Sequence, residues 1–298
     1  MKQNFEHFLI TRINIDWHIS RPKTVQERND PNFLSYRLDL FEQICLPSVI
    51  AQKNQNFKWL LLFDKNLPDS FQKRINDYLI KDKIISVYIT DKNSCLETIK
   101  STINEYFDSS KQYLITTNLD SDDALSDDFV TVIQNNFAHQ QLEFINFPFG
   151  YLYRFEDEQL YLREWLTAPC HTLIETYKNF NTALSYSHAS ITRYKVKQIF
   201  TKPMWLMIAH GNNVRTSYDV SAAWQPISRL KNNFHIKFKL GNSSDNFHQN
   251  ENIFKNIYKV IISKKSWDTP QVKLRKILNI VNPSIIRSLR KVTYSIKK

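Results

Sequence analysis

The chain has 298 residues, of which 42% are hydrophobic and 13% aromatic. This is enough for one large α/β domain or two small ones, and it excludes a mainly disordered protein. No apolar run reaches about 18 residues, so we expect no membrane-spanning helix, and the N-terminus lacks the regions of a signal peptide. The net charge of +11 lies in residues 255–298, which hold 12 of the 40 Lys and Arg residues and one of the 29 acids.

Two residue types exclude common sites. The chain has three glycines, so a Gly-rich phosphate loop is excluded, and any bound phosphate must be neutralised by a metal, by side chains or by a helix terminus. Its three cysteines stand far apart without metal-type spacing, and we expect reduced structural thiols.

Apolar, β-prone runs alternate with segments of helical periodicity along the first half of the chain. Strands are predicted at residues 6–15, 57–63, 84–89, 113–117 and, as two short strands, within 143–155, and helices at 35–51, 68–81, 94–107 and 126–138. Pro47 is expected to kink or end the first of these helices. The alternation predicts βαβ units and a mostly parallel, doubly wound sheet.

The pattern becomes irregular after residue 155. A short apolar strand is expected before His210-Gly211, and residues 226–252 read as a polar linker. Asp268-Thr269-Pro270 and Asn282-Pro283 are helix starts, so a basic amphipathic helical tail is predicted over residues 253–298. The α/β domain would then span residues 1–225.

Three carboxylates, Asp120, Asp122 and Asp123, follow the apolar run that begins at Tyr113. Ligands collect at the carboxyl ends of parallel strands, and adjacent acids repel each other unless a cation lies between them. Oxygen ligands suit Mg²⁺ or Mn²⁺, so one interpretation is a metal site that holds a diphosphate. The other is a helix N-cap, since acids also belong in the first turn of a helix.

Several blocks of sequence occur in a characteristic order. They are Arg37–Glu42, Leu46–Gln52, Phe57–Asp64, Leu119–Leu125 and His210–Arg215. In this order and spacing the chain resembles the rhamnosyltransferase family of bacterial GT-A glycosyltransferases, over roughly residues 6–220. Asn118 departs from the family pattern, in which we expect a basic residue two places before the first Asp. The tail beyond residue 225 lies outside the resemblance.

The resemblance implies a GT-A fold and a nucleotide-sugar donor bound at the carboxyl ends of the sheet. It implies Mg²⁺ or Mn²⁺ bridging the carboxylates and the diphosphate. Asp122 is expected to be a direct metal ligand, Asp120 to hold the metal or the ribose, and Asp123 to hold the metal or cap the next helix. His210 is expected to be the third ligand or a structural histidine.

The nucleotide is expected to contact residues at other strand ends. The candidates are Thr11 and Arg12 after the first strand, Asp64 after the second, Asp91 after the third, and Arg215 at the phosphates. By the resemblance, an acid at position 64 bonds a nucleobase N–H. Each candidate has an ordinary alternative as a polar loop residue, and function is favoured for Arg12 and Asp64.

An inverting transfer needs a general base near the acceptor hydroxyl. Glu175 is the first candidate, followed by Glu164 and then His188, and each is also explained by a structural role. Trp165 and Tyr186 are candidates for stacking on sugar rings, against the commoner role of core aromatics.

The sequence thus predicts a metal-dependent glycosyltransferase of bacterial surface-polysaccharide synthesis, acting on a glycan or lipid-linked acceptor. The basic tail is expected to contact anionic lipid at the inner face of the membrane in the cytoplasm; the alternatives are a solvated tail or nucleic-acid binding, for which no recognition motif is present. The alternative functions are a nucleic-acid-binding protein and a metal-dependent nucleotidyltransferase. The latter normally has a basic or Gly-rich loop near the first strand, where this chain has no Gly.

Overall fold

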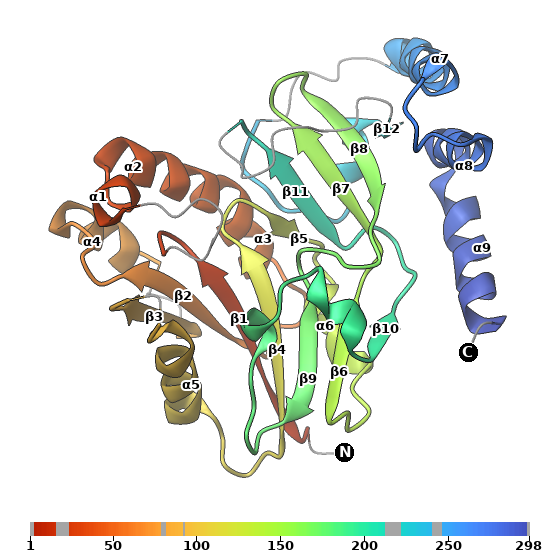
Figure 1. Cartoon of the computed structure of the whole chain (residues 1–298). Coiled ribbons are helices and arrows are strands. Elements are labelled where there is room, and N and C mark those ends of the chain that lie inside the picture. Colours follow the sequence, from red (N-terminus) through yellow and green to blue (C-terminus); the bar gives the residue numbers. More distant parts are fainter. Residues whose placement is uncertain are drawn as a thin grey trace.

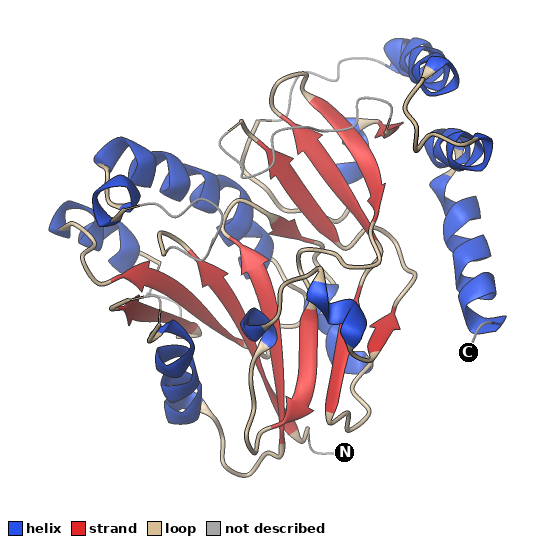
Figure 2. Cartoon of the chain, in the orientation of Figure 1, coloured by secondary structure: helices blue, strands red, loops and turns tan. Residues whose placement is uncertain are grey.

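The computed structural model describes residues 3–15, 24–78, 82–91, 93–211, 222–239 and 246–296. Two β-sheets and their covering helices form the body, and three C-terminal helices run along one side of it (Figure 1). Figure 2 shows the strands of the two sheets in red, with the helices in blue around them. None of the described helices is long and apolar enough to cross a membrane.

The larger sheet has seven strands in the order β10-β6-β9-β4-β1-β2-β3. Their bounds are β1 Phe5–Arg12, β2 Lys58–Asp64, β3 Ile84–Ile89, β4 Tyr113–Asp120, β6 Leu142–Asn146, β9 Thr172–Thr176 and β10 Val196–Gln198. All neighbouring pairs are parallel except those of β9, which runs antiparallel to β4 and β6. The predicted mostly parallel α/β sheet is confirmed.

Both faces of this sheet are buried, because alternate residues of each strand enter different cores. On β1, Phe5 and Leu9 lie in one cluster, and Phe8 and Ile10 in another. The helices of this half are α1 Val25–Arg28, α2 Pro31–Leu40, α3 Leu46–Ile50, α4 Asp69–Asn76, α5 Cys95–Tyr106 and α6 Phe129–Asn135. Helices α2, α3, α4 and α6 contribute side chains to the first cluster, and α5 contributes side chains to the second.

Of the two expected effects of Pro47, an end of the helix does not occur. α2 continues through a π-helical turn, Phe41–Cys45, directly into α3. Proline has no N–H for the carbonyl of Gln43, four residues earlier. That carbonyl instead accepts bonds from the backbone N–H groups of Lys237 (2.7 Å) and Phe238 (3.3 Å). Because of the proline, the Gln43 carbonyl is available for hydrogen bonds from the segment that follows β12.

The smaller sheet has the order β12-β8-β7-β11-β5. Its strands are β5 Ala124–Leu125, β7 Phe149–Arg154, β8 Gln159–Glu164, β11 Trp205–Ala209 and β12 Ala223–Gln225. β7 and β11 are parallel, and the other pairs are antiparallel. Because β5 directly follows β4 in the chain, the two sheets meet at the acid cluster.

The C-terminal part packs on the smaller sheet. It comprises the 3₁₀ turn η4 Ile227–Leu230 and helices α7 Asn246–Ile262, α8 Pro270–Val281 and α9 Pro283–Ile296; two further 3₁₀ turns, η2 Ala183–Ser185 and η3 Ser190–Arg193, lie earlier. Leu230 and Phe234, from the expected linker, are buried in one cluster with Val260, Ile280 and Ile286 of the helices. The described part of that segment is thus packed chain, and the tail helices are docked on the body.

Candidate active site at the ends of β1, β2, β4 and β11

Three of the predicted residues lie at the carboxyl ends of adjacent strands. Arg12 ends β1, Asp64 ends β2 and Asp120 ends β4, and Arg12 and Asp120 are register partners. On each of these strands every second side chain faces the core that α5 covers, and Arg12, Asp64 and Asp120 fall in that alternation. All three therefore lie on the same face of the sheet. The structure therefore brings these side chains to one edge, as parallel strands require.

The acid cluster forms a turn and does not cap a helix. The Asp123 N–H donates to the Asp120 carbonyl (3.2 Å), and the chain then enters β5, not a helix. Helix α6 starts at Phe129, with Asp128 at its N-cap position. Ala124 pairs with Leu206 of β11. This pairing holds the start of β11 beside the turn, and His210 follows the last residue of that strand.

Asp122 and His210 face each other across this junction. The distance from the His210 Nε2 to the Asp122 Oδ2 is 2.9 Å, and both side chains are largely buried. Arg37 of α2 lies on the other side, with 3.7 Å from its Nη1 to the same Asp122 oxygen. Burial raises the pKa of Asp122, but the charge of Arg37 and the contact with His210 outweigh it and hold the pKa well below its usual range. Asp122 is therefore an anion at neutral pH.

Tyr36, one residue before Arg37, holds the far side of the His210 ring. Its hydroxyl lies 3.0 Å from His210 Nδ1 and 3.4 Å from the His210 carbonyl oxygen. The Asp122 carboxylate can only accept, so at 2.9 Å the His210 Nε2–H donates to it and the Tyr36 hydroxyl donates to the unprotonated Nδ1. A metal bound at Asp122 would need the other tautomer, with the proton on Nδ1, and the Tyr36 hydroxyl could then accept from Nδ1–H and donate to the carbonyl oxygen.

Asp120 is the exposed member of the cluster. Its carboxylate is 38% exposed as a side chain and is paired with Arg12 at 2.5 Å. From the resemblance we expect a basic residue two places before Asp120, where this chain has Asn118. Arg12, on the neighbouring strand, places a cation there instead.

The Asp123 carboxylate contacts the backbone of β11. It is buried, and its Oδ1 accepts the backbone N–H of Ile208 in β11 at 3.3 Å. Burial, with the charges of Asp122 and Asp120, raises its pKa well above the usual value. These contacts favour a structural role, in which Asp123 holds β11 against the turn, over the expected roles of metal ligand or helix cap.

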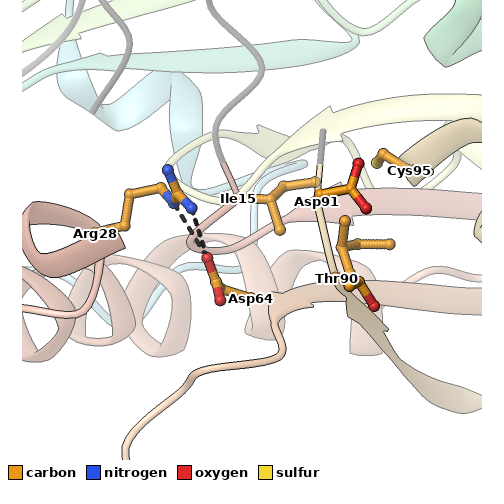
Figure 3. Close-up of a pocket in the computed structure, with 7 residues that line it drawn as sticks. Ile15, Arg28, Asp64, Thr90, Asp91 and Cys95 are labelled. Carbon is orange, nitrogen blue, oxygen red and sulfur yellow. Dashed lines mark hydrogen bonds and ion pairs between the residues drawn. The ribbon is translucent and has the colours of Figure 1, made fainter. Parts of the chain in front are cut away.

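Asp64 and Asp91 line one small pocket (Figure 3). Arg28 of α1 points at Asp64, with 2.7 Å from its Nη2 to Oδ2, and the other Asp64 oxygen accepts from Asn66. Asp91 accepts from the backbone of Asn93 and Ser94 at the start of α5, and these bonds lower its pKa. The pocket volume of about 80 Å³ is below the several hundred Å³ of whole-ligand sites, so it suits one part of a ligand, such as a base.

Two nucleotide candidates are not placed at this edge. Thr11 is fully buried on the opposite face from Arg12, where its hydroxyl accepts the indole N–H of Trp59 at 2.9 Å. The two-residue period of a strand explains the error, because neighbours on β1 point to opposite faces. Arg215 lies outside the described residues.

The first two general-base candidates do not lie at the site. Glu175 is the register partner of Leu114, six positions before Asp120 on β4, which at 3.3 Å per residue is about 20 Å away. It is buried and accepts the N–H groups of Asn181 and Thr182, both at 3.0 Å. Burial raises its pKa, but its contacts are those of a loop anchor, so the geometry does not fit a general base.

Glu164 instead joins the tail to the body. It lies opposite Phe149, at the end of β7 away from His210, and pairs with Arg290 of α9 (2.7 Å) and Arg275 of α8 (3.6 Å). This position also does not fit a general base.

His188 is exposed, in the loop between η2 and η3. Thr116 accepts the Ala183 N–H (2.8 Å) and points to the same face of β4 as Asp120, so this loop packs on the face that carries the site.

The two aromatic candidates have core contacts. Trp165 stacks on Trp205, and Tyr186 packs edge-on against Phe144.

Three residues that contact the site have no role in the sequence-based prediction, namely Arg28, Tyr36 and Arg37. They lie on α1 and α2, which pack over the strand ends. Arg37 also donates to the Ser121 hydroxyl at 2.6 Å, inside the acid turn. For the two arginines the signal is indirect: without a Gly-rich loop, basic side chains are one of the ways to neutralise a bound phosphate.

The donor set fits a hard divalent cation in part. Ligands bound at right angles and about 2.1 Å from a metal stand about 3 Å apart, close to the 2.9 Å between Asp122 Oδ2 and His210 Nε2. Asp120 adds an exposed carboxylate two residues away. Among the described residues, however, no three His, Cys, Asp or Glu side chains converge as a ligand set. Asp120 would have to leave Arg12 to join the pair.

Comparison with known proteins agrees with this geometry. A family model described as "Putative rhamnosyl transferase" matches residues 10–221, which include every described residue of the site. A search of curated proteins finds no match.

Solved structures match this chain at low identity. The structure of S. aureus TarS 1-349 in complex with UDP is 9% identical, with a TM-score of 0.40, over 98% of this chain and 75% of that one. HddC from Yersinia pseudotuberculosis is 12% identical, with a TM-score of 0.36, over 66% of this chain and 92% of that one. The inositol-1-phosphate CTP transferase from T. maritima is 11% identical, with a TM-score of 0.33, over 71% and 92%.

Proposed function

Because the chain belongs to the rhamnosyl transferase family and is a glycosyltransferase, we propose that it transfers a sugar from a nucleoside-diphosphate-sugar with the help of Mg²⁺ or Mn²⁺. The observation that carries this proposal is the Asp122–His210 pair at the end of β4 and β11. A carboxylate and an imidazole 2.9 Å apart, beside a second carboxylate, offer adjacent positions to a divalent cation. Rhamnose is the sugar that the family name supports.

When bound, the metal would neutralise the charge that develops on the leaving diphosphate. Asp122 and His210 are its proposed ligands, and Asp120 is the third ligand or a contact to the ribose. Arg12 and Arg37 both lie against these carboxylates, where their guanidinium groups can bind phosphate oxygens. They take the place of the Gly-rich loop that the chain lacks.

For the nucleoside we propose the pocket at Asp64. Asp64 is held in place by Arg28 and Asn66 and lies at the end of β2, two strands from β4. Neighbouring strands are about 4.8 Å apart, so base and diphosphate sites would be separated by about 10 Å. Asp91 shapes the pocket wall but is engaged in capping α5.

For the acceptor we propose a glycan or a lipid-linked glycan, as in bacterial surface-polysaccharide synthesis. His188 is the remaining candidate for the general base of an inverting transfer, since its loop packs on the face that carries Asp120. The basic C-terminal helices support a peripheral contact with anionic lipid at the cytoplasmic side of the membrane.

A binding experiment tests the donor site. Thermal unfolding is measured with a panel of nucleoside diphosphates and nucleotide-sugars, each with Mg²⁺, Mn²⁺ or EDTA. We expect one nucleotide to raise the melting temperature only with metal, because a ligand that binds the folded state stabilises it.

The variant Asp122→Asn keeps the shape of the side chain but removes the charge, and it should abolish that rise. Glu143→Gln is the matched control, since Glu143 is also a buried carboxylate with a cationic partner, Lys195, but lies on β6. A metal-dependent rise of equal size in Asp122→Asn and wild type would show that the site lies elsewhere.

A further inference from the structure

Helix α7 carries two apolar stripes, of which the body covers one. Ile253, Ile257 and Val260 pack in the cluster of the smaller sheet. On the other side Phe254 and Tyr258 are 73% and 63% exposed, and Ile261 and Ile262 continue the stripe at the next turn. A surface helix of a soluble domain normally has one apolar stripe, so the second stripe requires a partner.

The next two helices repeat this arrangement. Ile280 of α8 and Ile286 of α9 are buried against the body. The exposed apolar side chains of the tail, together called the outer tail surface, are Phe254, Tyr258, Ile261, Ile262, Trp267, Leu274, Val281, Ile285, Leu289 and Val292. They are ten of the sixteen exposed large hydrophobic residues in the described part of the chain.

The charge around the outer tail surface has one sign. Lys255 and Lys259 of α7, Lys264 of the connection to α8, and Lys291 of α9 are exposed. Asp268 is the only acid in residues 252–298, and it is buried with 2.6 Å from its Oδ1 to the Nζ of Lys276. The surface therefore presents apolar and cationic groups together, which suits a partner with an anionic rim and an apolar interior.

The body holds these helices in a fixed orientation. Glu164 pairs with Arg290 and Arg275, and Tyr294 donates to the Val196 carbonyl at 3.3 Å. Gln225 of β12 donates to the Asn279 carbonyl at 2.8 Å. Figure 1 shows the three helices following one another down one side of the molecule, beside the sheets. A partner on the outer tail surface would thus be fixed relative to the site at β4.

We propose that the outer tail surface is the docking site for an anionic lipid membrane, with its apolar side chains at the acyl boundary and its lysines at the headgroups. This inference rests on the peripheral membrane contact in the proposed function and names the side chains that make it. It does not depend on the transferase reaction, because vesicle binding is measured without a sugar donor.

The test uses the full-length chain and vesicles of phosphatidylcholine with or without 30% phosphatidylglycerol, as a chosen composition of roughly cytoplasmic-leaflet charge. We expect the protein to co-sediment with the anionic vesicles. Its affinity for the neutral vesicles, and for the anionic vesicles in high salt, should be at least about tenfold lower. Brominated lipid should quench tryptophan fluorescence, and the variant Trp267→Phe should lose that quenching while it still binds.

A variant with Phe254→Ser, Tyr258→Ser and Leu289→Ser should lose at least about tenfold in binding. The matched control carries Val25→Ser, Tyr88→Ser and Tyr106→Ser, which remove three of the exposed apolar groups of the body. Both variants are first checked for an unchanged melting temperature and for metal-dependent nucleotide binding. These checks separate failure of the docking surface from failure of the donor site.

Three results would overturn the proposal. One is equal vesicle binding by the triple tail variant and wild type. Another is unquenched Trp267 on anionic vesicles of brominated lipid. The third is self-association of the wild-type chain without vesicles that the tail substitutions abolish, since a second copy would then be the occupant.

Discussion

The tyrosine hydroxyl behind His210 acts on the candidate metal ligand from the side away from Asp122. Tyr36 contacts both Nδ1 and the backbone carbonyl of His210. Such outer contacts orient a ligating imidazole and fix its tautomer. The structure therefore assigns to α2 a part in preparing the site, in addition to covering the sheet.

Removing this hydroxyl should weaken metal binding. We predict that Tyr36→Phe lowers the affinity for Mn²⁺, in the presence of a nucleoside diphosphate, by about 10- to 100-fold. Titration of free Mn²⁺ by electron paramagnetic resonance measures this directly. Tyr78→Phe is the control, since the Tyr78 hydroxyl also bonds a side chain of another segment, the Glu42 carboxylate, but lies outside the site. Equal losses in the two variants would point to general loosening of the helices.

His7 predicts a pH dependence of stability. It is buried on β1 beside Thr117, with Nε2 to Oγ1 at 2.9 Å, and burial lowers its pKa from 6.5 to about 3. Between pH 6.5 and about 3, His7 is therefore protonated in the unfolded chain but neutral in the folded chain. The stability is therefore complete above pH 6.5 and is lost as the pH falls toward 3.

The comparison with His7→Gln isolates this effect. Well below pH 6.5, wild type should lose about 1.4 kcal/mol more per pH unit than the variant does. Urea unfolding between pH 5.5 and 4 gives the two slopes. Parallel slopes would mean that His7 is protonated in the folded state.

Among the elements, the junction of β7 and β11 depends on a missing side chain. A Cβ at Gly150 would lie 2.0 Å from the ring of Trp205, which is fully buried and donates to the Phe147 carbonyl. We predict that Gly150→Ala costs about 3 kcal/mol, measured by urea unfolding. The same substitution in a Trp205→Leu background should cost far less, because the clashing ring is gone. Equal costs in both backgrounds would contradict this packing.

The connection of the tail to the body predicts a change in local opening. Glu164→Gln removes the charge that Arg290 and Arg275 meet, and these arginines are 39% exposed, so we expect a loss of about 1 kcal/mol. Amide exchange in α8 and α9 should speed up while that of β1 and β4 stays unchanged. Uniform acceleration in all four elements would show that the pair supports the whole fold.

The elements themselves follow from local pattern more readily than their contacts do. The apolar runs that became β1, β2 and β4 are buried on both faces, which leaves a clear signal in the sequence. At Pro47 the sequence left open whether the helix is kinked or ended, because its effect is absorbed by a π-helical turn and by backbone donors about 190 residues later. No local rule contains that long-range contact.

At the scale of the whole molecule, the positions of some site residues could be predicted from the sequence and those of others could not. Asp120, Asp122 and His210 were predictable because each follows an apolar strand, and strand ends converge in a parallel sheet. Glu175 was misplaced because β9 runs antiparallel and reverses which end of the strand meets the site. Tyr36 and Arg37 lie on a helix whose packing over the strand ends no sequence pattern expresses.

The most direct test of the account is the thermodynamic coupling between metal and nucleotide at Asp122. Calorimetric titration measures the affinity for a nucleoside diphosphate with and without Mn²⁺, and for Mn²⁺ with and without the nucleotide. If the two ligands share the site at the end of β4, each should tighten the other by the same factor, and Asp122→Asn should abolish that factor. Independent binding of the two ligands in wild type, or equal coupling in Asp122→Asn, would contradict the account.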